Sequence, residues 1–165
     1  MTSDQNGDQR GDQPTDSPGV IALPPVIFVT ALVVGFAVEW LSPSMIIDSG
    51  SRIAAGIVVP LGGIVMIALG ILQHRRSGND PDPRNPDVTV MTSGIYQRTR
   101  NPIYIGYILV LAGIGLAANS MWVLVTVIPA YFVVRWGVIA REEAYLEAKF
   151  GQTYMDYKSS VRRWF

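Results

Sequence analysis

The chain has 165 residues, of which 49% are hydrophobic and only 16% are charged, and its formal net charge is zero. This balance is unlike that of an ordinary soluble domain, and it provides no electrostatic attraction to nucleic acid. The absence of cysteine excludes disulfides, thiolate metal sites and a cysteine nucleophile.

Residues 1–19 differ in composition from everything that follows. They are rich in Asp, Gln, Gly, Pro and Ser, and they contain no large apolar residue after Met1. A segment of this kind buries too little apolar surface to offset the entropy lost on ordering. We therefore expect a disordered, acidic cytoplasmic tail, followed by one membrane domain over residues 20–165.

Apolar segments in the rest of the chain have lengths near the roughly 20 residues that a helix needs to cross a bilayer. They cover about 24–41, 53–72, 103–118 and 121–140. Only Asn119 and Ser120 separate the last two, so these two are expected to form a tight antiparallel hairpin. Glycine and alanine recur in the second and third segments, which favours close helix packing. The predicted fold class is all-α, a polytopic protein with four transmembrane helices.

Basic residues are concentrated in two regions, the 73–102 loop and the 141–165 tail, whereas the turn at 119–120 has none. Cytoplasmic loops carry an excess of Lys and Arg. We therefore expect both regions in the cytoplasm and, because the number of spans is even, the N-terminus there too.

The tail also carries apolar residues at spacings of three and four, which predict one face of a helix. They are Leu146, Phe150, Tyr154, Tyr157, Val161 and Trp164. We interpret the tail as an amphipathic helix at the lipid headgroups, interrupted at Gly151. The alternative interpretation, compatible with the first, is a lid over a bound ligand.

Charged residues next to the fourth apolar segment are the first candidates for chemistry. Arg135 and Glu142 are seven residues apart and would share a helix face, with Glu143 about a quarter-turn away. Arg135 lies inside the apolar segment, where an unpaired guanidinium is costly. It is expected either to pair with Glu142 or to face a polar cavity that receives an anionic group.

The second candidate region lies before the third apolar segment. Asn101 and Pro102 predict a helix start, whose free amide groups suit a carboxylate or a phosphate. His74 is the sole histidine and has no partners at metal-ligand spacing, so we interpret it as an interfacial residue and predict no metal site.

From about Thr89 to Phe165 the chain resembles the membrane methyltransferases that comprise isoprenylcysteine carboxyl methyltransferases and phospholipid N-methyltransferases. The resemblance rests on an ordered set of short motifs. They are Val90-Met91-Thr92-Ser93-Gly94-Ile95-Tyr96, Arg100-Asn101-Pro102-Ile103-Tyr104-Ile105-Gly106, Glu142-Glu143-Ala144-Tyr145-Leu146, Phe150-Gly151-Gln152-Thr153-Tyr154 and Tyr157-Lys158. The position of Asn101 often holds histidine in these enzymes.

The resemblance implies S-adenosylmethionine as methyl donor, a lipid-like acceptor and a multi-pass protein of a bacterial cell membrane. It places the donor on the cytoplasmic side, among the 88–104 loop, the last two membrane helices and the tail. The implied donor-binding residues are Val88, Thr89, Val90, Met91, Tyr96, Arg100, Asn101, Pro102, Ile103, Tyr104 and Glu142. Catalytic roles are assigned to Arg135, Glu142 and Glu143.

One position departs from the isoprenylcysteine branch, where an arginine about one turn before the glutamates faces the substrate. Val138 stands at that place here, so Arg135 or Arg141 would have to replace it. Two other hypotheses remain open. One is a membrane reductase that uses a nicotinamide cofactor, against which Glu142 and Glu143 argue. The other is a helical bundle without enzymatic activity.

Overall fold

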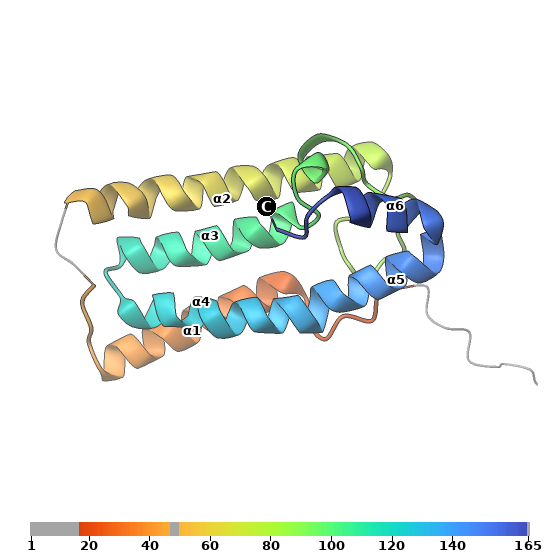
Figure 1. Cartoon of the computed structure of the whole chain (residues 1–165). Helices are drawn as coiled ribbons and strands as arrows, with labels where there is room; N and C mark the ends of the chain where they lie inside the picture. The colour runs from red at the N-terminus through yellow and green to blue at the C-terminus, as the bar shows by residue number, and fades with distance from the viewer. Residues whose placement is uncertain (1–16, 47–49, 165) are drawn as a thin grey trace, which may run out of the picture.

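The computed structural model describes residues 17–46 and 50–164. Most of the expected N-terminal tail, residues 1–16, lies outside these ranges. The described part of the chain is all-helical and contains no strand, as the sequence predicts. Its four long segments run in alternating, antiparallel directions (Figure 1).

The first two helices are α1, Pro24–Leu41, and α2, Gly50–Ser77. Helix α3 covers Pro102–Ala117, and α4 covers Met121–Val134. A short 3-10 helix, η1, forms at Gly94–Gln97 in the loop between α2 and α3. Helix α2 packs alongside α3 and α1 packs alongside α4, so the bundle consists of two antiparallel pairs joined through α3 and α4 (Figure 1).

Three helical stretches are long and apolar enough to cross a membrane, namely Pro24–Leu41, Gly50–Ser77 and Met121–Phe150. Helix α3 is apolar but has only 16 residues, or about 24 Å at 1.5 Å per residue, against about 30 Å of hydrocarbon. A count of four spans therefore stays a prediction. Large apolar side chains are exposed along these helices, for example Val33, Leu61 and Ile128, as expected of a surface that faces lipid.

Glycine at seven-residue spacing brings α2 and α3 into close contact. A Cβ added at Gly63 would lie 2.6 Å from the carbonyl oxygen of Gly106, and one added at Gly106 would lie 2.6 Å from that of Gly63. Gly56 and Gly70 lie one heptad to either side of Gly63 and also face α3. Because lipid supplies no hydrophobic drive between helices, this close packing stabilises the pair.

The last long segment is not a uniform α-helix. After α4 comes a π-helical turn, η2, at Arg135–Ile139, and then α5, Ala140–Phe150. The amide of Ala140 donates to the carbonyl of Arg135, five residues back. A π turn leaves one carbonyl without its usual α-helical partner. Here the carbonyl of Gly137 accepts a hydrogen bond from the amide of Ile21 at 3.2 Å, which fixes the N-terminal segment beside η2.

Gly151 ends α5 with a positive φ of 52°, as its predicted role as an interruption requires, and α6 follows at Gln152–Ser160. Most of the predicted apolar stripe packs on the protein itself. Tyr154 and Tyr157 are buried with Tyr96 of η1, and Leu146 packs against this cluster. The stripe therefore serves at least partly as internal packing, and its headgroup role stays a prediction.

Candidate functional site

One end of the bundle holds a cavity of about 390 Å³. It lies where the C-terminal end of α2, the loop over residues 79–101, the start of α3, α5 and α6 come together (Figure 1). Small-molecule sites typically measure roughly 300–1,000 Å³. The wall includes residues from both distant stretches singled out in the sequence, namely Tyr96, Asn101 and Tyr104 from one and Glu142 from the other.

Tyr104 and Glu142 connect the two sides of this cavity. The hydroxyl of Tyr104, in the first turn of α3, donates a hydrogen bond to Oε1 of Glu142 on α5. This bond occupies one of the two carboxylate oxygens of Glu142. The second oxygen of Glu142 has no hydrogen-bond partner in the described part of the chain, so this carboxylate can still accept from a ligand in the cavity.

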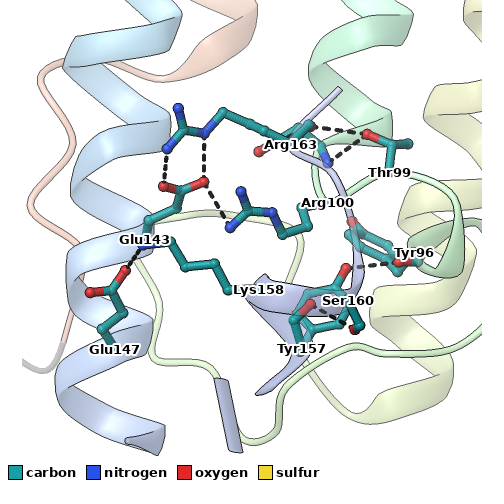
Figure 2. Close-up of polar contacts among 10 residues, drawn as sticks. Tyr96, Thr99, Arg100, Glu143, Glu147, Tyr157, Lys158, Ser160 and Arg163 are labelled. Atoms are coloured by element: carbon teal, nitrogen blue, oxygen red, sulfur yellow. Dashed lines mark hydrogen bonds and ion pairs between the residues drawn. The ribbon is translucent and has the colours of Figure 1, made fainter. Parts of the chain in front are cut away.

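Glu143, the next residue, is 7% exposed and is held by two arginines. Arg163 donates from Nε to Oε1 at 2.8 Å and from Nη2 to Oε2 at 2.5 Å. Nη1 of Arg100 lies 3.2 Å from Oε1 of the same carboxylate. Figure 2 shows both guanidinium groups directed at Glu143. This carboxylate therefore serves as the centre of a buried ion cluster with a net positive charge.

The last described residues, 161–164, lie beside the loop that precedes α3. The carbonyl of Arg163 accepts from Oγ1 of Thr99 at 3.1 Å and from Nδ2 of Asn101 at 3.0 Å, and the amide of Arg100 donates to the carbonyl of Arg162 at 3.1 Å. Thr99 is completely buried. Together with the Arg163 ion pair, these bonds fix the start of α3 relative to α5 (Figure 2).

Two tyrosines of α6, Tyr154 and Tyr157, line the cavity and pack against Tyr96 of the loop. The hydroxyl of Tyr157 donates to the carbonyl of Tyr96 at 2.8 Å. Burial raises the pKa of Tyr154 to about 12 and raises the pKa of Tyr157 further above the usual value near 10. Burial also raises the pKa of Tyr96, and the negative charge of Glu142 adds to this effect. These phenols stay neutral hydrogen-bond donors throughout the physiological range.

The 79–89 loop is closed by one side chain. Oδ1 of Asn79 accepts from the amides of Val88 and Thr89 at 2.8 and 3.1 Å, and its Nδ2 donates to the carbonyl of Thr89 at 2.8 Å. Asn79 is only 4% exposed. These three hydrogen bonds hold the loop in place as one wall of the cavity. Asp80 and Asp87 of the same loop also line the cavity.

The cavity gathers most of the residues that the sequence analysis proposed for the site. The proposed residues in its wall are Thr89, Val90, Met91, Tyr96, Arg100, Asn101, Pro102, Ile103, Tyr104, Glu142 and Glu143. Val88 does not line the cavity, and its side chain is 70% exposed. Arg135 does not line it either. The roles of all these residues stay predictions.

The position of Arg135 follows from the π turn. The expectation that Arg135 and Glu142 share a face assumes α-helical winding between them, but η2 intervenes. Each residue of a π turn rotates the chain less than a residue of an α turn does, because its hydrogen bond spans five residues. The two side chains therefore leave the helix in different directions. Val138, which is completely buried, does not line the cavity, and neither does Arg141, which donates to the carbonyl of Gly19.

Several residues of the site were not identified from the sequence. They are His74, Asn79, Thr99 and Arg163. Thr99 and Arg163 interact across more than 60 positions, and no local pattern signals such a contact. Asn79 lies between the second apolar segment and a proline-rich stretch. An asparagine at such a place often hydrogen bonds the backbone of a loop, so this pattern could have indicated its role.

Comparisons with known proteins identify a family for this chain. A family model described as phospholipid methyltransferase matches residues 51–153, well over half of the chain. A protein of Haemophilus influenzae described as "Uncharacterized protein" is 40% identical over 62 residues, which make up 38% of this chain and 98% of that protein. No solved structure gives a significant match. The chain belongs to the phospholipid methyltransferase family of membrane methyltransferases.

Proposed function

We propose that the chain transfers a methyl group from S-adenosylmethionine to a lipid-like acceptor, and that the donor binds in the cavity between the 79–101 loop, the start of α3 and α5. The observation that carries the proposal is that Tyr96, Asn101 and Glu142, from two distant stretches, line one cavity of about 390 Å³. Family membership supports the reaction class. When bound, the donor supplies a methyl group on a positively charged sulfur.

The residues of the cavity suit the chemical groups of this donor. Glu142 has a free carboxylate oxygen for the donor's ammonium or ribose hydroxyls. The rings of Tyr96 and Tyr104 can meet the sulfonium charge by cation–π attraction. Nε of Arg100 is buried and has no hydrogen-bond partner in the described part of the chain, so it can receive the donor's carboxylate near the start of α3.

Catalysis in such a site depends mainly on alignment and on exclusion of water, because the transferred methyl group is already electrophilic. The buried cluster around Glu143 holds the start of α3 against α5 and so keeps Tyr104 opposite Glu142. We assign Glu142 to donor binding and Glu143 to positioning. Arg135, outside the cavity wall, has no such support.

The acceptor is proposed to be an amphipathic molecule with a reactive head and a lipid chain, as in the isoprenylcysteine and phospholipid branches. Apolar side chains form much of the cavity wall near the starts of α1 and α3, including Leu23, Ile71 and Tyr107. They suit an acceptor that enters from the membrane. We further propose that this end of the bundle faces the cytoplasm, since the 73–102 loop and the 141–165 tail carry most basic residues.

Equilibrium binding of labelled S-adenosylmethionine to the purified protein tests the proposal. Wild-type protein is expected to bind the donor, and Glu142→Gln is expected to weaken binding at least about tenfold, because a hydrogen bond to a charged group contributes about 1.5–3 kcal/mol. Glu147→Gln is the matched control, since Glu147 is on the same helix but pairs with Lys158 outside the cavity. Equal affinity in both variants would reject the role of Glu142, and absence of binding to wild-type protein would reject the proposal.

A further inference from the structure

The C-terminal end of α2 places an imidazole in the cavity wall. His74 lines the cavity together with Tyr96, and their rings meet edge to face with centroids 5.7 Å apart. Nδ1 of His74 lies 3.0 Å from the carbonyl oxygen of Gly70, one turn earlier, and 3.2 Å from the hydroxyl of Tyr96. The sequence predicts an interfacial histidine at this position, and these contacts limit which ring nitrogen can carry the proton.

The carbonyl of Gly70 determines which ring nitrogen carries the proton. A carbonyl oxygen can only accept, so a bare Nδ1 at 3.0 Å would oppose two lone pairs. Nδ1 is therefore protonated in the neutral ring, and it donates to Gly70. Nε2 is then the bare nitrogen, and no group in the described part of the chain hydrogen bonds to it. Because a protonated Nδ1 cannot accept a hydrogen bond, the hydroxyl of Tyr96 can donate to a ligand instead.

We infer that His74 is the proton acceptor of this site and that Nε2 takes the proton which a lipid amine must lose to be methylated. This inference rests on the function proposed above. A lipid amine is protonated near neutral pH and has no lone pair until a base removes a proton. Nε2 takes that proton, the amine nitrogen bonds to the donor's methyl carbon, and the bond from carbon to sulfur breaks. The sulfur keeps the electron pair, and the imidazolium returns its proton to water.

The carboxylates in the cavity wall are less suited to this role. Glu143 is bound by two arginines, and Glu142 accepts from Tyr104 and is assigned to the donor. Asp80 accepts from the side chain of Asn85 and from the amide of Asp82. The titratable and charged groups that line the cavity with His74 are Asp80, Asp82, Asp87, Tyr96, Arg100, Tyr104, Tyr107, Glu142, Glu143, Tyr154 and Tyr157.

The protonation state can be measured directly because His74 is the only histidine. Untagged protein with 15N-labelled histidine, in detergent or nanodiscs, gives the signals of one ring. The expected result is a protonated Nδ1 and a bare Nε2 at high pH, with Nε2 taking up a proton as the pH falls. A neutral ring protonated on Nε2 would overturn the inference, and this measurement needs neither donor nor a variant.

The second test measures labelled donor transfer to phosphatidylethanolamine vesicles over a range of pH. His74→Gln is expected to slow transfer about 100-fold or more, the usual contribution of a general base, and to remove the loss of rate at acidic pH. The affinity of this variant for the donor should stay within about twofold of wild type, because His74 is not assigned to donor binding. Arg76→Gln, an exposed neighbour on α2, is the control and should behave as wild type.

The outcomes separate the inference from the function on which it rests. If wild-type protein binds the donor but methylates only carboxylates or thiols, the inference is overturned and the proposed function stands. Transfer to phosphatidylethanolamine by His74→Gln at the wild-type rate, with an unchanged acidic limb, also overturns it. If wild-type protein does not bind the donor at all, the proposed function fails instead. Should His74→Gln fail to fold, the 15N measurement on wild-type protein decides.

Discussion

Arg163 and Glu143 are joined by two hydrogen bonds, at 2.8 and 2.5 Å, which connect residues 161–164 to the helix that carries Glu142. The carbonyl of Arg163 also accepts from Thr99 and Asn101 at the start of α3. One residue near the C-terminus thus connects the two stretches that form the cavity. The order of the site therefore depends on contacts made by the end of the chain.

Glu143→Ala is expected to destabilise the protein by about 3–5 kcal/mol, because it leaves Arg100 and Arg163 partly buried without a carboxylate. Chemical or thermal unfolding in detergent measures this change. Glu147→Ala removes the ion pair between Glu147 and Lys158, which is more exposed than the cluster around Glu143, and should cost only about 0–1 kcal/mol. Equal losses in the two variants would contradict the buried-cluster assignment.

Tyr104→Phe is expected to weaken donor binding about tenfold or more without unfolding the protein. The phenol is the described partner of Glu142, and a hydrogen bond to a charged group contributes about 1.5–3 kcal/mol. Isothermal titration with S-adenosylmethionine measures the affinity. Tyr131→Phe is the control, since Tyr131 packs against Trp164 and does not line the cavity. An unchanged affinity in Tyr104→Phe would show that this hydrogen bond does not support the donor site.

Much of the fold follows from apolar runs and glycine spacing. The predicted first segment, 24–41, coincides with α1, and the predicted hairpin turn at Asn119 and Ser120 lies between α3 and α4. The predicted second segment, 53–72, falls short of α2, which extends to Ser77. Hydropathy detects only the apolar part of a helix, whereas the polar last turns of α2 are stabilised by packing against η1.

Only those residues of the site that belong to recognisable sequence motifs could be predicted. Arg100, Asn101 and Glu142 line the cavity, and short patterns in the sequence indicated them. The exclusion of Arg135 could not be foreseen, because a π turn has no reliable local signature and it shifts the register of every later side chain. The proton position inferred for His74 depends on the distance between its Nδ1 and the carbonyl oxygen of Gly70, which residue spacing alone does not reveal.

A glycine pair tests the close packing of α2 and α3. Gly106→Ala is expected to cost about 1–3 kcal/mol, since the new Cβ would lie 2.6 Å from the carbonyl of Gly63, a backbone atom that cannot move aside. Gly62→Ala is the matched control, with nothing within 4 Å of its Cβ. The control should be neutral or stabilising by about 0.5–1 kcal/mol, because alanine favours a helix. Loss of stability in both variants, measured as melting temperature, would contradict this interface.

Stability is expected to fall in alkaline solution between about pH 10 and pH 12. Burial raises the pKa of Tyr154 to about 12, whereas an unfolded chain has a value near 10. The folded state then holds the proton more tightly, so its contribution is fully present below pH 10 and is lost as the pH rises toward 12. Melting temperatures from pH 8 to 11.5 measure the slope. Tyr154→Phe should flatten it, and an identical slope in the variant would show that another group is responsible.

The central claim is that residues from the 79–101 loop, the start of α3, α5 and α6 enclose one methyl donor. Ultraviolet crosslinking of labelled S-adenosylmethionine to the purified protein, with peptide mapping, tests it most directly. The account predicts label in peptides that contain Tyr96 or Tyr104 and in peptides that contain Leu146 or Tyr154, with competition by unlabelled donor. Competable label found only at the opposite end of the bundle, near Glu39 and Trp122, would contradict it.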